Sequence, residues 1–146
     1  MPRRIESLVD AIASQNGFLD PKSRAYQNRN PLLLRAFSSK HEKDELGIRI
    51  FKNFASGYDN SANDALIKCS GRSHSKVTPF STLLDLIQVY GHPITAGRVV
   101  KNFLRAALND DGIVERTQLR WFVDETLSVS DALPNAVEDR TNRLAA

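Results

Sequence analysis

Apolar residues near the N-terminus recur with the spacing of a helix. They fall at positions i, i+3, i+4 and i+7, which places them on one helix face, and they are Ile5, Leu8, Val9 and Ile12. Gly17 follows shortly after them and can adopt the left-handed backbone conformation that ends many helices. The pattern therefore predicts an amphipathic helix that stops just before Gly17.

The segment from Gly17 to Asn30 has few apolar residues and several cations and amides, so it is predicted to be a long basic loop. At its end, Asn30-Pro31 joins a capping side chain to a proline that suits the first position of a helix. This pair predicts a short helix whose apolar residues are Leu32, Leu33, Leu34 and Phe37.

Two sequences of the capping-box type come next. Ser39 to Glu42 predicts the start of a helix that closes at Gly57, with inward residues Leu46, Ile50, Phe51, Phe54 and Ala55. Positions 46–50 also alternate as a strand would, but the cap and the later i+4 spacing favour a helix. Ser61 to Asp64 predicts a further short helix that runs through Lys68.

One helix is expected before residue 92 and another after it. Thr78-Pro79 predicts the start of the first, which ends at Gly91, and Thr95 is expected to cap the second, which runs to about Leu108. Their short link gives the pair the outline of a helix-turn-helix. The side chains expected to be buried between them are Leu83, Leu84, Ile87, Val100, Phe103 and Leu104.

The remaining elements are shorter. Asn109-Asp110-Asp111-Gly112 predicts a turn, because Asx side chains and glycine supply its special backbone conformations. A helix with inward residues Leu119, Phe122 and Val123 is expected after it. A last, weaker helix is expected around Pro134 and to fray near Arg143. The whole pattern predicts an all-α fold, a compact single-domain bundle of about six to eight short helices.

Composition agrees with one globular domain. The chain has 146 residues, 41% hydrophobic and 25% charged, and no apolar run approaches the length of a membrane span. The start of the chain lacks the pattern of a secretory signal, and the single cysteine, Cys69, fits a reducing compartment. We expect a cytoplasmic protein with no membrane contact, an all-α domain over residues 1–130, and an acidic, partly frayed C-terminal helix or tail over 131–146.

Charge is distributed unevenly along the chain. Through Arg105 there are 16 basic and 9 acidic residues, whereas from Ala106 onward there are 4 basic and 8 acidic residues. A positive body is attracted to polyanions, so DNA or RNA is the expected partner. Small domains also carry such asymmetry by chance, and that alternative remains open.

The clearest candidate contact surface lies on the helix after Thr95. Its polar face carries three cations at i, i+3 and i+7 with an amide beside them, and these residues are Arg98, Lys101, Asn102 and Arg105. Cations stacked along a helix match successive phosphates of a nucleic-acid backbone, and the arginine and amide side chains can reach base edges. The alternative is an ordinary solvated face.

Two basic loops could add to this surface. Serines and cations alternate between residues 68 and 76, and the cations there are Lys68, Arg72 and Lys76. The earlier loop interleaves Tyr26 with Lys22, Arg24 and Arg29, as proteins that stack single-stranded bases do. The loops strengthen the nucleic-acid interpretation only if they share a face with the helix.

No catalytic or metal-binding set emerges. One cysteine and three scattered histidines do not make a zinc site, and no nucleophile has a base and an orienting group at suitable spacing. We therefore expect no cofactor, no metal and no enzymatic activity, and a small regulatory or accessory nucleic-acid-binding protein.

Trp121 supports the alternative function. On a helical wheel it lies away from the inward stripe of its helix, so it is either covered by the last helix or exposed as an anchor for another protein. The alternative is thus an α-helical protein-interaction module that uses Trp121 and the acidic C-terminal segment.

Overall fold

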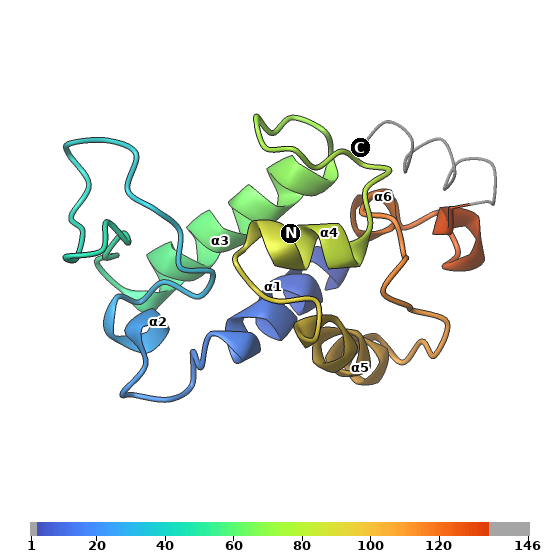
Figure 1. Cartoon of the computed structure of the whole chain (residues 1–146), viewed down its shortest axis with the longest axis horizontal. Coiled ribbons are helices and arrows are strands. Elements are labelled where there is room, and N and C mark those ends of the chain that lie inside the picture. The colour runs from blue at the N-terminus through green and yellow to red at the C-terminus, as the bar shows by residue number, and fades with distance from the viewer. Residues whose placement is uncertain (1–2, 135–146) are drawn as a thin grey trace. The chain divides into compact units, whose positions relative to one another are not determined.

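Six α-helices and one short 3-10 helix form the regular structure of residues 3–134, the part of the chain that the computed structural model describes. The helices are α1 (Arg3–Gln15), α2 (Arg24–Gln27), α3 (Phe54–Cys69), α4 (Leu83–Val89), α5 (Ala96–Leu108) and α6 (Arg120–Val123), and the 3-10 helix is η1 (Ser130–Ala132) (Figure 1). β-Structure in these residues consists of isolated bridges. The predicted all-α class is confirmed.

The chain divides into two compact units, the N-terminal unit (residues 1–67) and the C-terminal unit (residues 68–146). Within residues 3–134, no helix is both long and apolar enough to cross a membrane. The expected division into 1–130 and 131–146 stays a prediction, because residues 135–146 lie outside the described residues.

Helix α1 forms as the sequence pattern predicts. Its apolar face is buried, with Ile5, Leu8, Val9 and Ile12 all at 0% exposure. Gly17 has a φ of 69°, its N–H donates to the Ser14 carbonyl, and the N–H of Phe18 donates to the Ala13 carbonyl. These paired bonds satisfy carbonyls left free at the helix end, which is why the helix stops there. The predicted glycine stop is confirmed.

The two helices predicted between residues 31 and 57 do not form, and both predictions are wrong. Asn30 is fully buried, and its carboxamide accepts from the N–H of Leu34 and donates to the carbonyls of Leu34 and Arg49. It therefore joins two irregular segments instead of capping a helix. Arg35 and Ile48 form an antiparallel bridge, so the strand-like alternation over 46–50 was the better indication.

Asp44 organises the second of these segments. Its carboxylate accepts from the backbone N–H groups of Leu46 and Ile48, from the Asn28 carboxamide and from the Arg24 guanidinium. Burial of the carboxyl opposes its ionisation, but the hydrogen bonds from Asn28, Arg24 and the backbone outweigh that effect and hold the pKa of Asp44 well below its usual value. The ionised carboxylate thus stabilises the fold of the N-terminal unit.

Acid should destabilise the N-terminal unit through Asp44. Its pKa is lower in the folded than in the unfolded chain, so its stabilising effect is complete above about pH 5 and is lost as the pH falls below about 4. We expect Asp44→Asn to lower the melting temperature by several degrees at pH 7 and to flatten its dependence on pH between about 5 and 3. Thermal melts followed by circular dichroism test this. Glu45→Gln, at the exposed carboxylate that also pairs with Arg24, is the control and should change little.

Helix α3 is one continuous helix where two were predicted. It begins after Asn53, whose side-chain oxygen accepts from the N–H of Ser56, so neither predicted capping box starts a helix. Gly57 lies inside the helix and does not end it. A Cβ atom at Gly57 would lie 1.7 Å from the carbonyl oxygen of Arg29, so only glycine permits this close approach.

Helix α4 of the C-terminal unit has a different start from the predicted one and the same end. Thr82, not Thr78, caps it, in a capping box with Asp85. Thr78 instead forms a turn in which its hydroxyl accepts from the N–H of Phe80. At the other end Gly91 has a φ of 88°, and the N–H of His92 donates to the Ile87 carbonyl. The predicted stop at Gly91 is confirmed.

Helix α5 occupies the predicted range but is rotated relative to the predicted core stripe. Its buried face comprises Ala96, Gly97, Val100 and Leu104. Phe103 is 37% exposed and Val99 is 54% exposed, so the expected burial of Phe103 is wrong. A Cβ atom at Gly97 would lie 2.9 Å from the Leu84 side chain. Because glycine has no side chain, α4 can pack closely against this face of α5. Thr95 precedes the helix without forming a side-chain cap.

The predicted turn at 109–112 forms. Asn109 is left-handed with a φ of 49°, and the N–H of Gly112 donates to the Asp110 carboxylate. α6 is a single turn in the predicted place, and η1 lies in the segment expected to introduce the last helix, which itself was expected over residues that are not described. The expected fraying near Arg143 lies outside the described residues.

Candidate nucleic-acid interface

The basic side of α5 is held outward by the burial of its opposite side. Val100 and Leu104 are fully buried and anchor the helix in the C-terminal unit. Arg98 and Asn102 are exposed and Lys101 is half-buried. Within residues 3–134, no hydrogen bond or ion pair engages these three side chains. They are thus available to a ligand in solution.

Arg105, the fourth residue of this set, is fixed in place. Its Nε donates to the carbonyl oxygen of Ile113 at 2.7 Å, which ties the end of α5 to the segment after the 109–112 turn. The two terminal nitrogens of the guanidinium remain for a ligand, but the side chain also has a structural role. We call Arg98, Lys101, Asn102 and Arg105 the α5 basic set.

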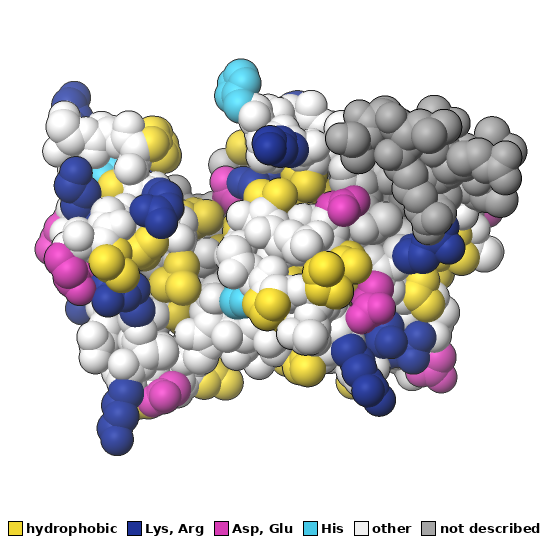
Figure 2. Space-filling view, in the orientation of Figure 1, with side chains coloured by type: hydrophobic (Ala, Val, Ile, Leu, Met, Phe, Trp, Pro, Cys, Tyr) yellow, Lys and Arg dark blue, Asp and Glu magenta, His cyan; other side chains and the backbone are white. Residues whose placement is uncertain are grey.

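Acidic residues limit the positive field of this surface. A Cβ atom at Gly97 would lie 3.0 Å from a carboxylate oxygen of Glu115, so that carboxylate lies against the first turn of α5. In Figure 2, Lys and Arg side chains over α5 lie next to Asp and Glu side chains. The surface therefore suits local phosphate contacts more than long-range attraction.

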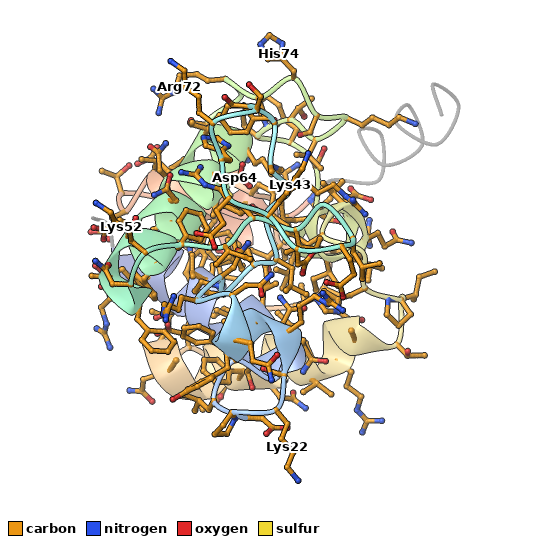
Figure 3. All side chains as sticks on the ribbon, turned by 90° about the vertical axis from the view of Figure 1, so that its left-hand side faces the viewer. Lys22, Lys43, Lys52, Asp64, Arg72 and His74 are labelled. Carbon is orange, nitrogen blue, oxygen red and sulfur yellow. The ribbon has the colours of Figure 1, made fainter. Side chains whose placement is uncertain are left out.

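The loop cations of the C-terminal unit are separate from the α5 basic set. In Figures 1 and 3 the loop between α3 and α4, which carries Arg72, lies at the top and α5 lies at the bottom. Lys68 lies 5.2 Å from the ring centroid of Tyr90, and the Nε of Arg72 donates to the Ser70 hydroxyl. Lys76 is exposed. This loop and α5 do not form one continuous face.

Two of the three cations predicted in the first basic loop have structural partners. Arg24 forms ion pairs with Asp44 and Glu45, and Arg29 donates from Nη1 to the carbonyl of Phe51 at 3.0 Å. Lys22 is exposed and projects from the surface in Figure 3. In this loop Lys22 is therefore the cation best placed to meet a ligand.

Trp121 is buried in the C-terminal unit. Its side chain is 2% exposed, and its ring packs edge-on against Phe122 at 5.1 Å between centroids. Of the two alternatives for Trp121, burial is the one that the structure has. The acidic residues Glu138 and Asp139 of the proposed partner-binding segment lie outside the described residues.

Three aromatic side chains meet on the surface of the N-terminal unit, a feature that the sequence analysis missed. The rings of Tyr26 and Phe54 are 5.1 Å apart, and those of Phe18 and Phe54 are 5.8 Å apart with an edge-on geometry. We call Phe18, Tyr26 and Phe54 the aromatic cluster. Phe54 was expected to face inward from a helix that does not form, so only the alternation of Tyr26 with cations pointed toward this site.

Other chemistry is not apparent in this part of the chain. Residues 3–134 contain no group of three or more His, Cys, Asp or Glu side chains that could hold a metal ion. Cys69 is fully buried at the end of α3. Comparison of the chain with protein-family models, with curated protein sequences and with solved structures gave no match.

Proposed function

We propose that this protein is a non-enzymatic nucleic-acid-binding protein, a small regulatory or accessory factor that contacts phosphates through α5. The observation that carries the proposal is the α5 basic set. It holds two side chains, Arg98 and Lys101, that no described residue engages, on a helix whose other face is fixed in the core. Cations held in a fixed spacing gain affinity for a polyanion by releasing its condensed counterions.

The neighbouring side chains add to this support. Asn102 lies between Arg98 and Arg105 on the exposed side of the helix, and arginine and asparagine are the side chains that best read the edges of bases. Arg105 is held by Ile113, so less of its freedom is lost on binding. Phosphate contacts from Arg98, Lys101 and Arg105, with base contacts from Arg98 and Asn102, are the proposed roles.

A second candidate function is a protein-interaction module, and one observation favours it. The other flank of α5 exposes Val99 and Phe103, and Ile94 before the helix is 61% exposed. An apolar strip of this kind beside cations also suits a protein partner. Because Trp121 is buried, this apolar strip replaces it as the proposed contact surface of the protein-interaction module.

The proposal is tested with Arg98→Ala/Lys101→Ala. Both side chains are unengaged, so folding should be unchanged within about 0.5 kcal/mol. We expect weaker binding to a labelled duplex in electrophoretic mobility shifts, and a log–log salt slope flattened by about 1.8, or roughly 0.9 for each lost phosphate contact.

The matched control is Lys40→Ala/Lys43→Ala, which removes the same charge from exposed lysines of the N-terminal unit. Equal losses in the two double variants would mean that net charge alone drives binding, and would contradict a site on α5. Failure of the wild type to retard DNA or RNA at low salt would remove the nucleic-acid function altogether. A complex lost in Val99→Ala/Phe103→Ala alone would favour the protein-interaction function.

A further inference from the structure

The rings of the aromatic cluster pack against each other and are nevertheless partly exposed to solvent. Phe54 is 42% exposed and Tyr26 is 37% exposed, and Leu19, one residue after Phe18, is 88% exposed. Rings in contact with one another usually lie in a core, where burial of their area stabilises the fold. Here each ring gains contact with its neighbours and still presents part of its surface to solvent.

The local structure fixes the cluster in place. Ser23 caps α2 by accepting from the N–H of Tyr26, so that ring lies on a defined helical turn. Phe54 is the first residue of α3, directly after the capping residue Asn53. The N–H of Phe18 donates to the Ala13 carbonyl at the end of α1. Three separate backbone devices thus hold the three rings, which lowers the cost of ordering them on binding.

Cations flank the cluster in the chain. Lys22 precedes α2, Lys52 lies two residues before Phe54, and both side chains project from the surface in Figure 3. Neither lysine forms an ion pair or hydrogen bond through its side chain with another described residue. Asp20 is the one acidic residue between Phe18 and Tyr26, and its carboxylate accepts from the backbone N–H of Lys22.

We propose that the aromatic cluster stacks the bases of single-stranded nucleic acid, with Lys22 and Lys52 on the adjoining phosphates. The inference rests on the proposed function, because it takes nucleic acid as the ligand. It adds a second contact surface and a preference for unpaired strands. Every base has a π-face, so exposed rings bind unpaired bases of any sequence, whereas bases in a duplex are stacked on each other and are not accessible.

The observations favour nucleic acid over a protein at this site. A surface that binds a hydrophobic protein has aliphatic and aromatic side chains and few charges at the centre of the interface. Charged residues at the rim of such an interface are of either sign. The exposed residues next to the ring-bearing segments in the sequence instead include Lys22 and Lys52, whose side chains no described residue engages, and such cations complement a polyanion. Protein binding is therefore an outcome that the test must exclude.

The test compares Tyr26→Leu/Phe54→Leu with the wild type by fluorescence anisotropy of a labelled oligothymidine strand and of a labelled duplex. Leucine keeps apolar bulk and removes the ring. We expect binding to the strand to weaken by about 10-fold or more, because loss of even one base–ring stack lowers the affinity by about that factor. Binding to the duplex should stay unchanged, because its bases are already stacked on each other. Phe37→Leu, an 86% exposed ring outside the cluster, is the matched control and should bind as the wild type.

A second variant, Lys22→Ala/Lys52→Ala, removes exposed side chains and leaves the rings intact, so it tests the site even if the leucine variant unfolds. Its salt slope for the strand should fall by about 1.4, roughly 0.7 for each phosphate contact. Its duplex binding should be unaffected.

The possible failures are distinguishable. Strand binding at wild-type level in both variants overturns the stacking site, and the proposed function then stands or falls with Arg98→Ala/Lys101→Ala. Equal losses for strand and duplex in Tyr26→Leu/Phe54→Leu also overturn it, because a duplex offers no unpaired base. If the wild type binds neither ligand at low salt, the proposed function and this inference both fall, and a protein becomes the expected occupant of the cluster.

Discussion

Replacing Gly57 by alanine should destabilise the N-terminal unit by about 3 kcal/mol, the upper end of the usual range for overpacked sites. The added Cβ would lie 1.7 Å from the carbonyl oxygen of Arg29 and 2.9 Å from its carbonyl carbon. Backbone atoms cannot rotate away as a side chain can, so α3 and the loop at Arg29 must separate. Arg29 itself has a φ of 51°, which leaves that segment little freedom to adjust.

The sign of this effect makes the experiment decisive. In an ordinary helix interior, glycine to alanine stabilises by about 1 kcal/mol, because alanine has less backbone entropy to lose. Urea denaturation followed by far-ultraviolet circular dichroism measures the change. Asn63→Ala, at an exposed position of the same helix, is the control and should be neutral or slightly stabilising. A Gly57→Ala protein more stable than the wild type would show that α3 does not contact the Arg29 carbonyl.

Leu104→Ala and Phe103→Ala should differ strongly although the residues are neighbours. Leu104 is fully buried on α5, so its truncation should cost about 2 to 5 kcal/mol through lost apolar burial and the cavity left behind. Phe103 is 37% exposed on the adjoining flank, and its truncation should cost less, about 1 to 2 kcal/mol, because only part of its ring area is buried.

Chemical denaturation of the two variants under the same conditions gives the comparison. It is valid if the free energy of unfolding depends on denaturant concentration with the same slope in both variants. The sequence pattern alone predicts that both side chains are buried, so a small cost at Phe103 would depart from that prediction. A larger loss of stability in Phe103→Ala than in Leu104→Ala would mean that Phe103 lies at the centre of the buried face of α5, as the sequence predicts. The α5 basic set would then face a different direction as well.

The sequence by itself determined the features that depend on a few neighbouring residues. The ends of α1 and α4 were predicted from Gly17 and Gly91, because a left-handed glycine closes a helix with bonds to carbonyls only a few residues back. The turn at 109–112 followed for the same reason. The positions of the α5 cations were also predictable, since a helix of this length fixes which residues share a face.

Only the tertiary structure decided the segment between residues 28 and 57. The side chain of Asn30 looks like a helix cap in the sequence, but Arg49, 19 residues away, provides one of its hydrogen-bond partners. Asp44 is likewise satisfied in part by Arg24 and Asn28, and Gly57 is required by the approach of Arg29. Such partners are distant in sequence, so local preference carries no information about them.

The same limit applies to the candidate site. Sequence predicts Arg24 and Arg29 in a basic loop, whereas Arg24 begins α2 in the structure. Only the fold shows that Asp44 and Phe51 engage these two side chains. The apolar positions of α5 left the centre of its buried face undetermined in the sequence. The close approach of α4 at Gly97 set that centre and left Phe103 partly exposed. The aromatic cluster brings together residues from the turn after α1, from α2 and from the start of α3, whose rings meet only in the folded chain.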